Sequence, residues 1–117
     1  MEIKYKVWDS ISEVMSPFAR ISNISVELFN DLEHYTLLLF TGFEDRKGHE
    51  IYDGDIIADW VETDEGLIQS KNQVFWNQPT GSWHLDHSPE QDKSYSTELW
   101  LELNDYDYEI VGNIYEI

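Results

Sequence analysis

The sequence predicts a mostly β protein, a small barrel with additional hairpin strands and at most one or two short helices. About seven or eight short stretches alternate apolar and polar residues, and turn signals separate them at a spacing typical of small barrels and sandwiches. The length of 117 residues suits a single domain that spans residues 1–117. Aromatic residues make up 15% of the chain, which supplies bulky side chains for a core without staples.

The centre of the chain, residues 41–59, carries the clearest turn chemistry. Asp45 begins a four-residue turn in which its side chain accepts a backbone N–H, and Gly48 supplies the positive φ that closes a hairpin. A second glycine turn follows at Gly54, with Asp55 directly after it. Apolar runs flank both turns, so a β-hairpin is expected here. We interpret Asp45, Gly48, Gly54 and Asp55 as structural turn residues.

The strands before and after this centre follow from period-two alternation. We expect an opening strand over residues 3–7, a second strand over residues 21–29, and a third over residues 35–43 that enters the central hairpin. After an acidic turn at residues 62–66, residues 67–76 are predicted to form a strand with a break near its middle.

The C-terminal third predicts shorter elements. Residues 77–81 form a hairpin loop, and residues 82–85 pair back as a strand. Ser88 resembles a helix N-cap followed by Pro, which predicts either a short turn or a helix running into residues 98–103. Residues 108–117 close the chain as a strand.

Tryptophan placement separates core from surface. Trp8, Trp60 and Trp100 lie in periodic segments, and we expect their rings in the core. Trp60 alternates with Ile56 and Ala58, and we expect these three residues to form the apolar face of their strand. Trp76 and Trp83 flank the 77–81 loop, so we expect them to be exposed together as a protein-binding patch.

The charge balance restricts the partners. Twenty-four acidic residues against seven basic ones give a formal net charge of −17. Repulsion at long range argues against direct binding of nucleic acid or of an anionic membrane. The balance permits a solubility surface or a surface that competes with nucleic acid for a basic protein. The acids considered for partner binding are Asp59, Glu62, Asp64 and Glu65.

The sequence predicts a cytoplasmic protein. There is no cysteine, which excludes disulfides and thiolate metal sites. The N-terminus is charged and lacks the apolar region of a signal peptide. The longest apolar run, residues 35–43, is far shorter than the roughly 20 residues of a membrane helix.

Two groups of residues are candidates for a metal site. His84 and His87 are close in sequence, but on a strand they face opposite sides, and no third ligand is evident. The simpler interpretation is a pair of surface histidines. Residues 105–109 carry three acids that would suit a hard cation, but they lack the glycine and spacing of a calcium loop. We predict no metal and no cofactor.

No catalytic constellation is evident. Asp53, Asp55 and Asp59 were weighed as paired carboxylates for hydrolysis, but turn chemistry already explains the first two. Phosphate-binding glycine loops, nucleophile elbows and zincin motifs are missing from the sequence. We therefore predict no catalytic residue. An enzyme would need Asp55, Asp59 or His84 in a concave, desolvated pocket.

Four segments, in this order, resemble the YopX family of phage and prophage proteins. They are residues 3–9 (IKYKVWD), residues 35–43, residues 45–57 (DRKGHEIYDGDII) and residues 108–115 (YEIVGNIY), of which the last two are the more specific. The resemblance implies a mostly β domain built on an SH3-like barrel, encoded by a phage or prophage and able to form a homo-oligomer. It also groups Gly112 with the turn glycines. The family offers no established catalytic residues to carry over.

The leading functional hypothesis is a non-catalytic phage or prophage accessory protein. It would act in the cytoplasm of the host bacterium by binding another protein or by self-association. The alternative is an acidic decoy that mimics nucleic acid and occupies the DNA- or RNA-binding surface of a host protein. An enzyme of unrecognised type ranks third.

Overall fold

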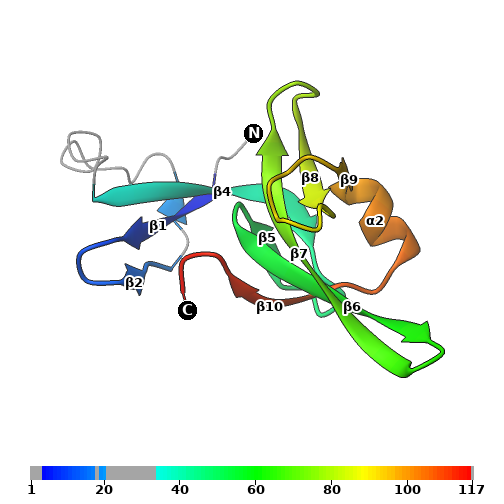
Figure 1. The fold of residues 1–117 in the computed structure, drawn as a ribbon. Coiled ribbons are helices and arrows are strands. Elements are labelled where there is room, and N and C mark those ends of the chain that lie inside the picture. The colour runs from blue at the N-terminus through cyan, green and yellow to red at the C-terminus, as the bar shows by residue number, and fades with distance from the viewer. Residues whose placement is uncertain (1–3, 18, 21–33, 117) are drawn as a thin grey trace.

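The computed structural model describes residues 4–17, 19–20 and 34–116 (Figure 1). Over these residues the chain forms two antiparallel sheets, and the first has the strand order β2-β1-β4-β5 with β3 beside β1. Its strands are β1 (Lys4–Asp9), β2 (Val14–Met15), β3 (Ala19–Arg20), β4 (Tyr35–Glu44) and β5 (Glu50–Tyr52). The strand predicted over residues 21–29 lies outside the described residues.

The second sheet has the order β10-β6-β7-β8-β9 and carries one short helix. Its elements are β6 (Asp55–Thr63), β7 (Gly66–Asn77), β8 (Ser82–Asp86), β9 (Ser96–Glu98), α2 (Leu99–Asp105) and β10 (Glu109–Asn113). One sheet curls into a half barrel, so the predicted small, barrel-like, mostly β fold with a short helix is confirmed. In the described residues, no helix has the length and apolar character that crossing a membrane requires.

The turn at Asp53 and Gly54 joins the two sheets. Gly54 has a φ of +85°, which confirms the predicted glycine turn. The N–H of Asp53 donates to the carbonyl of Leu39 in β4 at 2.9 Å, and the N–H of Gly54 donates to that of Val74 in β7 at 3.0 Å. The carbonyl of Gly54 accepts the N–H of Ile114 at 2.9 Å. This turn therefore ties the first sheet, the second sheet and the C-terminal segment together.

The Asp45 turn closes the β4–β5 hairpin and also reaches β10. Gly48 has a φ of +82°, and its N–H donates to the Asp45 carbonyl at 3.0 Å, as the turn prediction requires. The fully buried Asp45 carboxylate accepts N–H groups from Lys47 and His49, both at 2.9 Å, and from Ile110 at 3.0 Å. Burial opposes its charge, but these three donors outweigh burial and hold its pKa below the ordinary value.

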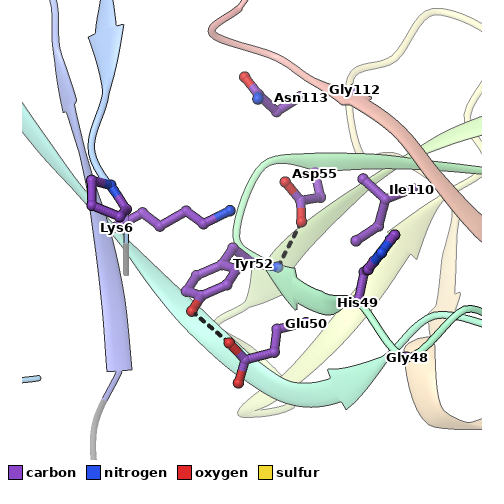
Figure 2. A pocket seen from close by; sticks show the side chains of 10 residues that line it. Lys6, Gly48, His49, Glu50, Tyr52, Asp55, Ile110, Gly112 and Asn113 are labelled. Atoms are coloured by element: carbon purple, nitrogen blue, oxygen red, sulfur yellow. Dashed lines mark hydrogen bonds between the residues drawn. The ribbon is translucent and has the colours of Figure 1, made fainter. Parts of the chain in front are cut away.

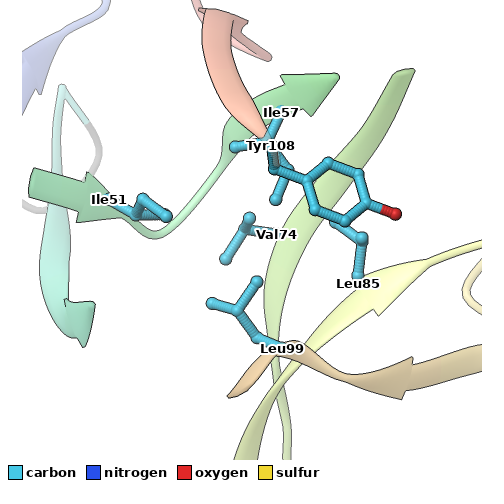
Figure 3. Packing of buried hydrophobic residues seen from close by; sticks show 6 residues of the cluster. All are labelled: Ile51, Ile57, Val74, Leu85, Leu99 and Tyr108. Carbon is cyan, nitrogen blue, oxygen red and sulfur yellow. The ribbon is translucent and has the colours of Figure 1, made fainter. Parts of the chain in front are cut away.

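The main core lies on the second sheet beneath α2 (Figure 3). Its buried side chains come from both sheets, the helix and the segment before β10, and they are Ile51, Ile57, Val74, Leu85, Leu99 and Tyr108. Ile57 is fully buried, whereas its neighbour Ile56 is only half-buried. The predicted apolar face of β6, which holds Ala58 and Trp60, is therefore only partly buried: Ala58 is buried, but the main core takes Ile57 from the opposite face.

The tryptophan predictions are only partly confirmed. Trp8 is buried, and its ring lies 5.9 Å from that of Tyr115. Trp60 and Trp100, expected in the core, are 59% and 46% exposed. Trp60 lies beyond Ala58, the last residue of β6 that β10 pairs, so β10 no longer flanks it. In α2 the preceding residue takes the buried position, which leaves Trp100 outside.

Two further sequence predictions need correction, and the structure decides between the two alternatives at Ser88. β7 runs unbroken, because β6 pairs with its first part and β8 with its last four residues. Of the two alternatives at Ser88, the short turn is confirmed: its hydroxyl oxygen accepts the N–H groups of Asp92 and Lys93, and the helix begins only at Leu99. Gly112 is not a turn residue: it lies inside β10 where the pairing with β6 shifts register, and its φ is not positive.

Gly54 provides a stability test of the junction. A Cβ on this residue would lie 3.0 Å from Cε2 of Tyr115 and 3.3 Å from Cγ1 of Ile114. We expect Gly54→Ala to lower the free energy of unfolding by about 1–3 kcal/mol from its positive φ alone, with a further loss from these contacts. Urea unfolding of the purified variant measures the change.

Gly42→Ala is the matched control for that variant. Gly42 has a φ of +90°, and a Cβ there would meet nothing within 4 Å. Both variants carry the same backbone strain, so the difference between them reports the contacts with the C-terminal segment. Equal losses in the two variants would contradict the close packing described at Gly54.

Candidate functional site

The hairpin of β6 and β7 extends past its neighbouring strands. The pairing of β10 with β6 ends at Ala58, and the pairing of β8 with β7 begins only at Val74. We call residues 59–70 the arm; in Figure 1 it projects away from the two sheets. Every residue from 60 to 68 is exposed. The outer edges of the arm have no strand beside them among the described residues.

Both faces of the arm carry large apolar side chains. Val61 and Ile68 are opposite each other in the register, so they share one face, and they are 49% and 51% exposed. Trp60 and Leu67 lie on the other face and are 59% and 66% exposed. A strand that buries one face alternates, whereas these apolar residues stand in adjacent pairs on either side of the turn. That paired pattern was the sequence signal that could have indicated an unburied hairpin.

The arm also gathers all four acids that the sequence suggested for partner binding, which are Asp59, Glu62, Asp64 and Glu65. Only Asp59 is half-buried, and the other three are exposed. No lysine or arginine occurs between residues 48 and 70, so the arm has no basic side chain of its own. The tip turns at Gly66, whose φ is +108°.

The predicted tryptophan pair is a real contact but not a shared exposed patch. Trp76 and Trp83 are register partners in β7 and β8, and their rings meet edge-to-face with centroids 5.2 Å apart. Trp76 is 44% exposed, and its indole N–H donates to Gln78 at 3.0 Å. Trp83 instead packs against the main core. Only Trp76 therefore remains available at the surface.

A cleft of about 610 Å³ opens where the two sheets meet (Figure 2). β1 contributes Lys6, β5 contributes Glu50 and Tyr52, β6 begins with Asp55, and β10 contributes Asn113. These residues are distant in sequence and converge because the Gly54 turn joins β5 of the first sheet to β6 of the second. Lys6, Glu50 and Tyr52 could not be predicted as site residues from the sequence, since no local pattern indicates that β1 lies opposite this turn.

Tyr52 organises the charged groups of the cleft. Its ring is buried, and Nζ of Lys6 lies 4.4 Å from the ring centroid. Its hydroxyl donates to Oε1 of Glu50 at 3.2 Å, and its backbone N–H donates to Oδ2 of Asp55 at 2.8 Å. Oε2 of Glu50 accepts Nζ of Lys4 at 2.8 Å. Asp55 is therefore the first residue of β6, its carboxylate bonds back across the turn to Tyr52, and it also belongs to the cleft.

Burial raises the pKa of Asp55 from its ordinary value of 3.8 to about 6. The N–H of Tyr52 and the charge of Lys6 oppose that rise, while Asp53 and Glu116 add to it. A carboxyl with such a pKa in a cleft is suited to proton transfer or to ligand binding. Among the described residues the lining includes no serine, threonine or cysteine, so these residues offer charge and hydrogen bonding in place of a nucleophile with its base.

The histidines weighed as metal ligands have other partners. His84 is buried and not on the surface as expected, and its ring nitrogens contact Ser96 at 2.7 Å and Thr80 at 3.1 Å. Nε2 of His87 contacts Thr97 at 2.8 Å and Glu102 at 3.2 Å. Across the described residues no three histidine or carboxylate side chains converge as metal ligands would.

The structure keeps the weighed carboxylates apart. Asp53 and Asp55 flank Gly54 but line different clefts, and Asp59 lies on the arm. The acidic stretch at residues 105–109 is also divided, because Glu109 forms ion pairs with basic residues of the Asp45 turn at 2.6 and 3.3 Å. Neither group therefore forms a paired-carboxylate or cation site.

These features define a small, mostly β protein with two antiparallel sheets, a projecting arm and a cleft at the sheet junction. The family model described as "YopX protein" matches residues 6–117, and the chain belongs to the YopX family. That family is of unknown function and has no known catalytic activity. The resemblance seen in the sequence is thereby confirmed.

A solved structure supports the fold. The crystal structure of protein EF1440 from Enterococcus faecalis is similar to this chain with a TM-score of 0.62 and 21% sequence identity. The likeness covers 97% of this chain and 94% of that one. No curated protein matches this chain.

The buried carboxyl in the cleft predicts a pH-dependent stability. The pKa of Asp55 is higher in the folded chain than in the unfolded chain, so its contribution to stability is complete below pH 4 and is lost as pH rises through about 6. A pKa difference of about 2 corresponds to about 3 kcal/mol. Asp55→Asn keeps an acceptor for Tyr52 and should therefore be more stable than the wild type at pH 8, with a gap that disappears towards pH 4.

Urea unfolding of both proteins between pH 4 and pH 8 measures this gap. Asp64→Asn is the control, because it removes the same charge from the exposed tip of the arm. The control should show a small gap that reflects only the reduced net charge. A gap for Asp55→Asn that is the same at every pH, or no larger than that of the control, would contradict the burial of this carboxyl.

Proposed function

We propose that this chain is a non-catalytic phage or prophage accessory protein that binds another protein, or a second copy of itself, through the arm. It would act in the cytoplasm of the host bacterium without contacting nucleic acid or membrane directly. The observation that carries the proposal is the arm itself, with exposed apolar side chains on both of its faces. Large apolar residues gathered on one projecting element are typical of interaction sites.

The backbone of the arm supports the same proposal. Each strand of a two-stranded hairpin pairs on one side only, which leaves the N–H and C=O groups of the outer edges available to another chain. Addition of a strand to such an edge is a common mode of protein recognition. Natural proteins usually protect long exposed edges with charged side chains, especially lysine, or with proline; the arm has no lysine or proline, and its only charged residues are acids. A partner that covers the arm would supply hydrogen bonds to these edges and bury the apolar faces.

The double variant Val61→Thr/Ile68→Thr tests this function. It removes an exposed apolar pair from the arm and keeps β-branched side chains, so the hairpin should remain intact. We expect the wild type to form a multimer by light scattering at micromolar concentration or to capture a specific protein from host lysate. The variant should lose at least tenfold of that binding, because each anchor contributes about 1 kcal/mol or more.

Val111→Thr is the matched control, since Val111 is 45% exposed but lies in β10, away from the arm. The control should bind like the wild type. The proposal would be wrong if the arm variant bound as tightly as the control, or if the wild type were a clean monomer that captured nothing.

The second candidate function is the acidic decoy, and the exposed acids of the arm favour it. Glu62, Asp64 and Glu65 stand at the tip with no basic side chain nearby in sequence, so a basic surface could approach them without competition. A decoy of this kind would bind DNA- or RNA-binding proteins of the host through charge.

Salt separates this candidate from apolar docking. Capture by a decoy should fall steeply between about 50 and 500 mM salt, because counterions screen exposed charges. The triple variant Glu62→Gln/Asp64→Asn/Glu65→Gln should abolish that capture and leave apolar docking unchanged. Capture that is insensitive to both salt and this variant would rule out the decoy.

A further inference from the structure

The cleft between the sheets has features of a small-molecule site, independent of the arm and of the function proposed for it. Its volume of about 610 Å³ falls within the range of about 300–1,000 Å³ that is typical of ligand pockets. It lies at the meeting point of two sheets, where side chains from β1, β5, β6 and β10 converge.

Most polar groups in the lining already have partners inside the protein. Both carboxylate oxygens of Glu50 accept hydrogen bonds, from Lys4 and Tyr52. The side chain of Asn113 donates to Glu116 at 2.7 Å and accepts two backbone N–H groups. These residues therefore shape the cleft but have little capacity left for a ligand.

Two opposite charges remain, and they face each other. Figure 2 shows the side chains of Lys6 and Asp55 pointing toward one another across the cleft. No ion pair within 4 Å joins them in the described part of the chain, and Oδ1 of Asp55 has no hydrogen-bond partner there. Tyr52 holds both groups in place, because its ring lies beneath the ammonium and its N–H binds Oδ2 of Asp55.

We infer that this cleft binds a small zwitterion of the α-amino acid class. The ligand's ammonium would donate to Oδ1 of Asp55, and its carboxylate would accept from Nζ of Lys6. An α-amino acid carries both charges on one carbon, so a single small molecule can present its ammonium to Asp55 and its carboxylate to Lys6. The side chains of Ile110 and Pro17 supply the apolar part of the lining, so an amino acid with a branched apolar side chain fits best.

The pairing of charges also sets the selectivity. A simple carboxylate would be attracted by Lys6 but repelled by Asp55. A simple amine would be attracted by Asp55 but repelled by Lys6. Only a molecule with both groups satisfies the two partly desolvated charges at once. The site should therefore bind a molecule that carries only the ammonium, or only the carboxylate, more weakly than the zwitterion.

Valine and its two halves test the inference. Isobutylamine is valine without the carboxylate, and isovalerate is valine without the ammonium. We would titrate each into the ¹⁵N-labelled protein at pH 8 and follow the backbone amide signals of Tyr52, Asp55 and Ile110. Valine should bind with a Kd at least tenfold lower than either half, and the shifts should concentrate on these amides.

Two variants connect the binding to the named charges. Lys6→Met keeps an apolar stem over the Tyr52 ring, and Asp55→Asn keeps an acceptor for the Tyr52 N–H; each should weaken valine binding at least tenfold. Lys93→Met is the control, because Nζ of Lys93 lies over the Phe75 ring at 5.6 Å in a different cleft. It should bind valine like the wild type.

The comparison among the three probes uses only the wild-type protein, so it stands even if a variant fails to fold. No binding of valine, or equal binding of valine and either half, would overturn the inference. Unchanged binding by a folded Lys6→Met protein would overturn it as well. A failed titration would leave the arm proposal untouched, because that proposal is measured by multimer formation and protein capture.

Discussion

The fold depends on a two-residue turn, Asp53 and Gly54, that has no space for a side chain at its glycine. Its backbone groups bond to β4, to β7 and to the segment after β10, so one bend holds three distant parts of the chain. A Cβ on Gly54 would lie only 3.0 Å from Cε2 of the Tyr115 ring. Because Tyr52 and Asp55 sit directly before and after this turn, the same bend creates the cleft between the sheets.

Asp45 also connects parts of the chain that are distant in sequence. Its buried carboxylate satisfies two N–H groups of its own turn and one from Ile110 in β10, 65 residues further on. A carboxylate in this position is a connector and not a reactive group, since backbone donors occupy both of its oxygens. The protein thus places a few acids inside with fixed partners and leaves most of the net charge of −17 on exposed elements such as the arm.

Local chemistry accounts for the sequence predictions that held. The Asp45 turn, Gly48, Gly54 and most strand positions follow from residues within a few places of one another, which is the range over which turns and alternation operate. The errors have non-local causes. Trp60 is exposed because β10 stops pairing at Ala58, and the core-facing side of β6 was decided by what packs above Ile57.

The sequence by itself determined that this is a mostly β chain of the YopX family, where its two glycine bends lie, and that its surface is strongly acidic. Only the tertiary structure decided that the β6–β7 hairpin outruns its neighbours and that Lys6 faces Asp55 across a cleft. The physical reason is the sequence separation of the residues that interact. A turn depends on adjacent residues, whereas the exposure of an arm and the lining of a cleft depend on where strands from distant parts of the chain begin and end.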